Sequence, residues 1–215
     1  SAEGYRARSC FIYYLGVANS GLVRRQLTDE VADRLRMRIM TGELRSGEFI
    51  RLDETAADFG CSVTPVREAL MMLRSEGLVH SFAHRGFAVE NLSRRDIVDI
   101  FWLQSELSAR LAMRAPGSEH LTESLPKLEQ IIDRLETAVQ AGDSETVATA
   151  EFEFHRGLYR LAESPKTAWF LVSVARYSPF ELYAGDAEWG ELAVASHRRL
   201  ISALRADDKP AIHAE

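Results

Sequence analysis

The chain has 215 residues, of which 46% are hydrophobic and 27% are charged, and its formal net charge is −6. This composition is typical of a folded globular protein and excludes a disordered or membrane-embedded chain. Residues 24–95 carry 12 basic and 11 acidic side chains, whereas residues 96–215 carry 12 basic and 20 acidic ones. Contact with nucleic acid would therefore depend on a few well-placed arginines in the first part.

The first 23 residues are the hardest to interpret. The apolar run 11–18 is too short to span a bilayer, so no membrane partner is expected. We expect residues 1–23 to form an arm or extra helix that packs on its own chain or on a partner. The two cysteines, Cys10 and Cys61, provide no disulfide framework, which favours a reducing, cytoplasmic location.

Residues 26–50 show the pattern of one helix followed by a turn. Thr28 is expected to cap the helix, because its hydroxyl suits an N-cap and acidic residues follow it. Gly42 is expected to end the helix, and Ser46–Ile50 to lead into a short strand. Apolar residues recur within the helix at the helical period: Val31, Leu35 and Ile39.

The stretch TAADFGCSVTPVREALMMLRSEGLV, residues 55–79, is the most informative part of the chain. Asp53 is expected to cap a short helix over residues 54–59, which would bury Ala56, Ala57 and Phe59. The pair Gly60-Cys61 then predicts a turn.

A second helix follows this turn. Ser62 or Thr64 is expected to cap it, and Pro65 suits its first turn. Its core-facing residues are predicted to be Val66, Ala69, Leu70 and Leu73, and its opposite face to carry Thr64, Arg67, Glu68 and Met71. Two helices joined by a glycine turn predict a helix-turn-helix, which holds one helix at an angle that fits the DNA major groove.

A hairpin is predicted after Gly77. The segments LVHSF and FAVENL, joined by a turn over residues 83–86, have the pattern of two short strands. Helix, helix-turn-helix and hairpin together predict a winged helix over residues 24–92.

These motifs resemble a known family. The string GCSVTPVREALMMLRSEGLV followed by RGFAV resembles the winged-helix domain of GntR-type bacterial transcriptional regulators, over roughly residues 26–92. The resemblance implies a double-stranded DNA operator as partner. It implies that Ser62, Thr64 and Arg67 meet phosphates and base edges, and that Arg85 and Gly86 reach the minor groove. Val63 departs from the family, which commonly has arginine there, so the operator sequence does not follow from the resemblance.

Beyond Ser93 no strand pattern occurs, and Pro and Gly residues separate successive helical segments. The predicted helices are 94–115, 119–141, 143–162, 165–178 and 186–206. Their apolar stripes predict an antiparallel helical bundle over residues 93–215. In the first of them, Ile97, Ile100, Phe101, Leu107, Leu111 and Met113 are expected to form the apolar side. The predicted fold class is therefore mostly α, with an N-terminal winged helix-turn-helix and a C-terminal all-helical antiparallel bundle.

Three residues of the bundle form a candidate metal site. Glu151 and His155 are four residues apart and so project from the same helix face. His197 lies on a later helix that would pack nearby. A carboxylate and two imidazoles suit a divalent metal such as Zn or Ni.

The same region resembles a known effector domain. The segments EFEFHRGLYRLAESP and SHRRLISALRADD resemble the FCD domain, which marks the FadR-like branch of the GntR family. The resemblance implies that Glu151, His155 and His197 hold a metal beside an organic-acid effector, with Glu in place of the more usual Asp. The family pattern places a fourth ligand beyond Glu215, and His213 stands at the wrong phase to replace it. Either the natural chain continues past this sequence, or water or the effector takes that position.

The expected effector contacts depart from the family pattern. Gln104 and Ser108 stand where family members often have Arg and Glu. A carboxylate effector is therefore expected to contact Gln104 and to rely on a cation elsewhere, such as Arg110 or Arg156.

The sequence thus predicts a homodimeric, ligand-controlled repressor rather than an enzyme. One alternative is a metal-dependent enzyme that uses Glu151, His155 and His197, but no dedicated nucleophile or general base accompanies them, and the winged helix would be unexplained. The other is a winged helix used for protein contact. An apolar recognition face would favour that alternative, whereas Thr64 and Arg67 argue against it.

Overall fold

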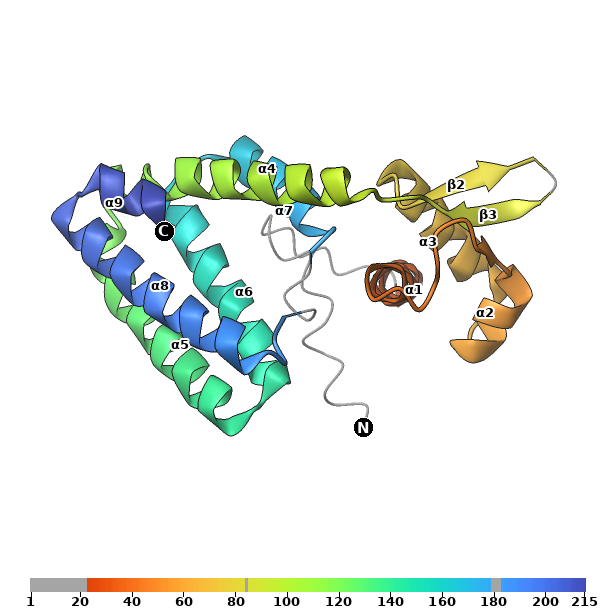
Figure 1. Cartoon of the computed structure of the whole chain (residues 1–215), viewed down its shortest axis with the longest axis horizontal. Helices are drawn as coiled ribbons and strands as arrows, with labels where there is room; N and C mark the ends of the chain where they lie inside the picture. The colour runs from red at the N-terminus through yellow and green to blue at the C-terminus, as the bar shows by residue number, and fades with distance from the viewer. Residues whose placement is uncertain (1–22, 84, 179–182) are drawn as a thin grey trace. The chain divides into compact units, whose positions relative to one another are not determined.

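The structure is a computed structural model, which describes residues 23–83, 85–178 and 183–215 (Figure 1). The predicted N-terminal arm falls on residues 1–22, outside the described residues, as does His84 in the predicted hairpin turn. The chain divides into two compact units, 1–98 and 99–215. Within the described ranges, no helix is both long and apolar enough to cross a membrane.

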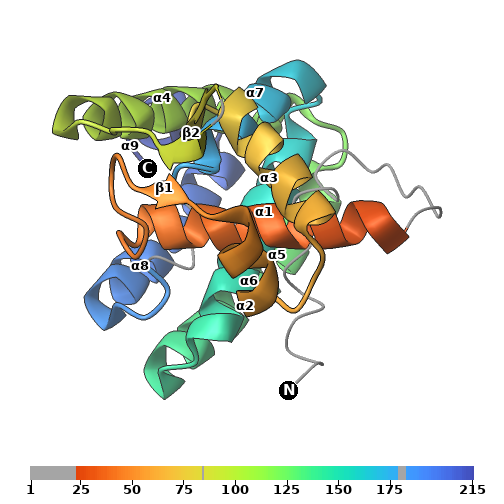
Figure 2. The ribbon, with the colours of Figure 1, turned by 90° about the vertical axis from the view of Figure 1, so that its right-hand side faces the viewer.

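The first unit is a winged helix, as predicted. Its three strands form an antiparallel sheet in the order β1-β3-β2, in which Val79 pairs with Val89 and Phe82 with Gly86. Figure 2 shows α3 crossing α1, with α2 beside them. The elements are α1 (Val23–Met40), β1 (Phe49–Ile50), α2 (Leu52–Asp58), α3 (Val63–Ser75), β2 (Val79–Phe82) and β3 (Gly86–Val89).

One face of α3 supplies much of the core of this unit. The residues predicted to face inward are all fully buried, and the apolar stripe of α1 packs against them. Each buried leucine or valine of this kind stabilises the fold by roughly 1.5–3 kcal/mol. The buried residues are Val66, Ala69, Leu70 and Leu73 of α3, and Val31, Ala32, Leu35 and Ile39 of α1.

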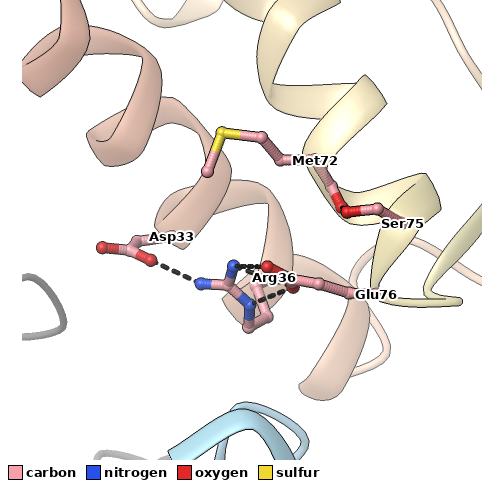
Figure 3. A network of polar contacts seen from close by, with 5 residues as sticks. All are labelled: Asp33, Arg36, Met72, Ser75 and Glu76. Carbon is pink, nitrogen blue, oxygen red and sulfur yellow. Dashed lines mark hydrogen bonds and ion pairs between the residues drawn. The ribbon is translucent and has the colours of Figure 1, made fainter. Parts of the chain in front are cut away.

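A buried ion pair joins the same two helices (Figure 3). The Arg36 guanidinium donates three hydrogen bonds of 2.9–3.0 Å to the Glu76 carboxylate, and each side chain is only 8% exposed. Arg36 also pairs with Asp33 of its own helix. Burial raises the pKa of Asp33, although Arg36 opposes that shift. The network fixes α1 against Glu76, the residue that caps the C-terminus of α3.

The predicted cap of the first helix is wrong. The helix begins at Val23, so Thr28 lies inside it and is buried. Its hydroxyl donates a 2.9 Å hydrogen bond to Glu68 of α3. The Thr28 side chain suits an N-cap, but it bonds to a residue of another helix. The pattern of residues within one helix does not reveal such a contact.

The short second helix also differs from the prediction in detail. Arg51, not Asp53, is its N-cap, and the Thr55 hydroxyl bonds back to the Arg51 carbonyl at 2.8 Å. Ala56 is buried as expected, but Ala57 is exposed and Phe59 is only half-buried. Fewer apolar residues of this helix are therefore buried than the sequence predicts.

The second unit is helical, as predicted. Helix α5 packs against both α6 and α8 (Figure 1). Two glycines permit this close approach, since a Cβ at Gly157 would lie 2.8 Å from Leu128, and one at Gly190 would lie 2.7 Å from Val139. The elements are α4 (Arg94–Ala112), η2 (Ala115–Gly117), α5 (Leu121–Ala141), α6 (Ser144–Leu161), α7 (Pro165–Ala175), α8 (Ala187–Ala206) and α9 (Lys209–Ala214).

Two features of this unit were not predicted. Helix α9 has Asp208 as its N-cap, whose carboxylate accepts a 3.1 Å hydrogen bond from the Ala211 backbone N–H, and Pro210 lies in its first turn. Along α4, two residues expected on the apolar side remain substantially exposed, Ile97 at 41% and Phe101 at 45%. An exposed apolar surface of this kind is typical of an interaction site.

We predict that Arg36→Met strongly destabilises the first unit. The substitution leaves the Glu76 carboxylate buried without its guanidinium, and breaking such a pair costs roughly 3–5 kcal/mol. Urea denaturation of the full chain would measure the loss. Arg51→Met is the control, because its ion pair with Glu54 is exposed and contributes below about 1 kcal/mol. Equal effects of the two substitutions would contradict a special role for the buried pair.

Candidate DNA-binding face and candidate metal centre

The N-terminal turns of α3 carry the first group of predicted site residues. Ser62 is the N-cap, and its side chain makes no capping hydrogen bond. Ser62, Thr64 and Arg67 are exposed, because α3 buries its other face against α1. Hydroxyl and guanidinium groups at the start of a recognition helix can bind phosphates and base edges.

The hairpin carries the second group. Arg85 is exposed, and its backbone N–H donates to the Phe82 carbonyl at 3.2 Å, which closes the turn. Gly86 opens β3 and pairs with Phe82. Both site residues therefore lie at the tip of the wing, as the sequence predicted for the hairpin.

Two other residues of the exposed α3 face differ in their roles. Met71 is 46% exposed and carries no charge. Glu68 accepts the hydrogen bond from Thr28, so its carboxylate is partly engaged within the unit. The sequence placed Glu68 on this face but gave no sign of that partner, which lies 40 residues away.

The structure brings Glu151, His155 and His197 together in the second unit. Glu151 and His155 lie one turn apart on α6, and His197 lies on α8. His197 Nε2 is 3.0 and 3.2 Å from the two Glu151 oxygens, and His155 Nε2 is 3.4 Å from Oε2. One candidate ligand atom from each residue lies within 4.8 Å of the others.

The Glu151 carboxylate is almost fully removed from water, at 1% exposure. Burial alone would raise its pKa, but hydrogen bonds from His155 and His197, with their charges, outweigh burial and hold the pKa at about 2. Burial lowers the pKa of His197 despite the adjacent carboxylate. The site therefore holds an ionised carboxylate among imidazoles near neutral pH.

Neighbouring side chains orient both imidazoles. The Phe154 ring stacks on His197 at 4.0 Å with an interplanar angle of 17°. The Tyr159 hydroxyl lies 2.9 Å from His155 Nδ1 and 3.0 Å from Ser108 Oγ. Burial raises the pKa of Tyr159 to about 12. Tyr159 is not among the site residues predicted from the sequence, although its spacing of four from His155 indicates a shared helix face.

These residues fit a divalent transition metal. One carboxylate and two imidazole nitrogens are the ligand types that Zn and related ions take, and both imidazoles direct Nε2 towards the carboxylate. A buried, ionised carboxylate also supplies the negative charge that favours a cation. Three protein ligands leave further coordination positions for water or an effector.

The predicted effector residues do not form one cluster of contacts. Gln104 is half-buried, and its amide donates to the Val174 carbonyl at 3.2 Å and to the Ser178 hydroxyl. Arg110 is exposed and Arg156 is half-buried. Neither arginine forms an ion pair with another residue in the described ranges.

A winged helix followed by a helical effector-type domain defines a DNA-binding transcription regulator. Residues 27–89 match the bacterial regulatory proteins of the gntR family, and residues 100–214 match the FCD domain. The chain belongs to the GntR family of transcriptional regulators and carries an FCD effector-binding domain. Both resemblances drawn from the sequence are thereby confirmed.

Proteins of similar sequence also carry names of transcriptional regulators. The chain is 30% identical to the "Probable D-xylose utilization operon transcriptional repressor" of Paenarthrobacter nicotinovorans, over 87% of this chain and 82% of that protein. It is 27% identical to the transcriptional regulator McbR of Escherichia coli, over 85% and 84%. The solved structure of E. coli McbR/YncC has the same fold, with a TM-score of 0.68, 22% identity and coverage of 87% and 90%.

We predict that Glu151 makes the second unit sensitive to acid in metal-free protein. Its folded pKa of about 2 lies below the unfolded value of about 4.3, so the ionised carboxylate stabilises the fold above that value. This contribution, on the order of 3 kcal/mol, is lost as the pH falls from about 5 towards 2.

The measurement compares the free energies of unfolding of the wild type and Glu151→Gln from neutral pH down through that range, in the presence of a chelator. The difference in free energy should be greatest near neutral pH and shrink on acidification. Glu153→Gln is the matched control on the same helix, because Glu153 is exposed and pairs with Arg134. A difference that did not vary with pH would contradict the role assigned to Glu151.

Proposed function

We propose that this protein is a repressor of the FadR-like branch, which binds a specific operator and is controlled by a small organic acid. The observation that carries the proposal is the division of α3 into two faces. One face is buried in the core, and the other exposes Ser62, Thr64 and Arg67. As a regulator of bacterial DNA it would act in the cytoplasm.

The DNA contacts would come from α3 and the wing. Ser62, Thr64 and Arg67 would enter the major groove, with Arg85 and Gly86 at the minor groove. Neither Arg67 nor Arg85 forms an ion pair within the described part of the chain, so both guanidinium groups are available to phosphates or bases. Binding would weaken as salt rises, because phosphate contacts release counterions.

The second unit would sense the effector. Glu151, His155 and His197 would hold a divalent ion such as Zn or Ni. When bound, such an ion supplies a positive centre that attracts a carboxylate. Gln104 and one of the arginines, Arg110 or Arg156, would contact the rest of the acid. By linkage, an effector that weakens DNA binding is itself bound less tightly by the DNA-bound protein.

A homodimer would complete the regulator, since paired recognition helices read the two halves of a near-palindromic site. Exposed aromatic residues on α4 and α7 support this proposal. Trp102 is 61% exposed and Phe170 is 55% exposed. The two helices are joined by the hydrogen bond from Gln104 to the Val174 carbonyl. Burying such residues against a second copy would remove a large apolar area from water.

We predict that Arg67→Ala weakens operator binding by about 1–3 kcal/mol at fixed salt, because a charged contact is lost. Fluorescence anisotropy would measure binding to a genomic fragment that the wild type retains. Arg205→Ala is the control, since Arg205 pairs with Glu129 in the second unit. Unchanged binding by Arg67→Ala would refute the proposed docking of α3.

We predict that the purified protein binds one Zn²⁺ ion per chain and that His155→Ala or His197→Ala abolishes tight binding. Loss of a ligand should lower the affinity for zinc by more than the roughly 10–100-fold loss that follows mutation of residues that only support the ligands. Competition with a chromophoric chelator would measure the affinity. His120→Ala is the control, because His120 is exposed beside Glu119. A protein that stays metal-free in these conditions would refute the metal site.

The sensing step has its own experiment, a thermal-shift screen of small carboxylates against zinc-loaded protein. One class of acid should raise the melting temperature, because a ligand bound to the native state stabilises it. The same acids should have a smaller effect on His155→Ala. A screen in which no acid shifts the melting temperature would contradict effector sensing by organic acids.

We predict that Trp102→Asp disrupts the homodimer, because a charge would be buried in the proposed interface. Sedimentation equilibrium would measure the molar mass, which should approach twice 24.2 kDa for the wild type. Leu192→Asp is the control, as Leu192 is equally apolar and 64% exposed on α8. A monomeric wild type at micromolar concentration would refute the proposal.

A further inference from the structure

The two nitrogens of the His155 ring face different chemistry. Nε2 lies 3.4 Å from Glu151 Oε2, on the side of the candidate metal centre. Nδ1 lies 2.9 Å from the hydroxyl of Tyr159, one turn further along α6. Tyr159 is buried, at 7% exposure, and its hydroxyl lies 3.0 Å from Ser108 Oγ on α4. The hydroxyl groups of Tyr159 and Ser108 therefore connect Nδ1 of His155 to α4.

The partners of the ring restrict where its proton can lie. An ionised carboxylate only accepts hydrogen bonds, so Nε2 carries the proton when it faces Glu151 directly. Nδ1 then has a lone pair, which accepts from the Tyr159 hydroxyl. Ligation of a cation through Nε2 requires the opposite tautomer, in which Nε2 has the lone pair and Nδ1 carries the proton.

A hydroxyl group is suited to both states, because it can donate or accept. When Nε2 carries the proton, Tyr159 donates to Nδ1 and can accept from Ser108. When Nδ1 carries the proton, Nδ1 donates to the Tyr159 oxygen, and Tyr159 donates to Ser108. The ring keeps its hydrogen bond in either case, and it stays in the same orientation. A carboxylate or an ammonium group at this place would support one state alone.

We propose that Tyr159 and Ser108 form a reversible hydrogen-bond relay that lets His155 exchange tautomers and so present Nε2 to a divalent cation. Tyr159 is thus a positioning residue that acts through His155. This inference rests on the proposed metal-binding function, which it deepens by naming residues that determine the affinity. The proton that leaves Nε2 is balanced by the proton gained at Nδ1, so the shift at this ring releases none.

The first experiment measures Zn²⁺ affinity of the full chain by chelator competition. Tyr159→Phe keeps the ring but removes the hydroxyl, and it should weaken binding roughly 10–100-fold. Ser108→Ala should weaken binding less, because Tyr159 can still accept from Nδ1. The double variant should resemble Tyr159→Phe, since Ser108 acts only through Tyr159. Tyr183→Phe is the matched control, because burial of its ring involves Phe101 and Trp189 instead of the histidines, and it should bind as the wild type does.

The second experiment reads the tautomer itself and needs no substitution. Nitrogen-15 NMR of the histidine side chains should place the His155 proton on Nε2 in metal-free wild type and on Nδ1 after zinc is added. This change follows from ligation through Nε2 itself, so it tests the tautomer exchange, and the exchange rate of the Nδ1 proton tests the role of Tyr159. In zinc-loaded Tyr159→Phe, the Nδ1 proton should exchange with water faster than in the wild type.

The outcomes separate the relay from the metal site. If the wild type binds zinc, His155→Ala does not, and Tyr159→Phe binds like the wild type, the relay is wrong and the metal site stands. An Nδ1 proton in both metal-free and zinc-loaded wild type would also overturn the relay, even if Tyr159→Phe failed to fold. A folded wild type that binds no zinc would overturn both proposals.

Discussion

The ion pair between Arg36 and Glu76 is the constraint on which the first unit depends. It joins α1 to the residue that caps α3, and both charges are largely removed from water. Such a pair tolerates little displacement, because each charge replaces the other's lost hydration. The hairpin begins directly after Gly77 and Leu78, so the same contact also fixes where the wing starts. The exposed face of α3 is therefore held in place from the opposite side of the helix.

The second unit buries a carboxylate in a different way. Glu76 is matched by a guanidinium, whose charge and hydrogen-bonding pattern are permanent. Glu151 is matched by two imidazoles, whose protons can move or leave. The guanidinium has no lone pair to offer a cation, whereas an imidazole can move its proton to the other ring nitrogen and so present a lone pair. The chemical identity of the partner, more than the degree of burial, thus separates a structural carboxylate from a candidate binding site.

The local pattern of the sequence was enough to predict the helix-turn-helix, the hairpin and most helices of the bundle. It could not predict contacts between distant residues. Thr28 has the chemistry of an N-cap, but its partner is Glu68 on another helix. The pairing of Glu151 with His155 followed from their spacing, while His197 required packing between α6 and α8. Ser108 stood out only as a departure from the family pattern, and its contact with Tyr159 could not be predicted because it depends on how α4 and α6 pack.

The DNA-binding unit carries almost no net positive charge. Residues 24–95 carry 12 basic and 11 acidic side chains, so bulk attraction to a duplex is weak. Arg36 and Arg38 are held by acidic partners. Arg67 and Arg85 are in no ion pair within the described ranges, and they lie on α3 and at the wing. Pairing with acidic residues offsets the charges of Arg36 and Arg38 inside the unit, whereas Arg67 and Arg85 carry theirs on the exposed helix face and the hairpin that we propose as the DNA contacts.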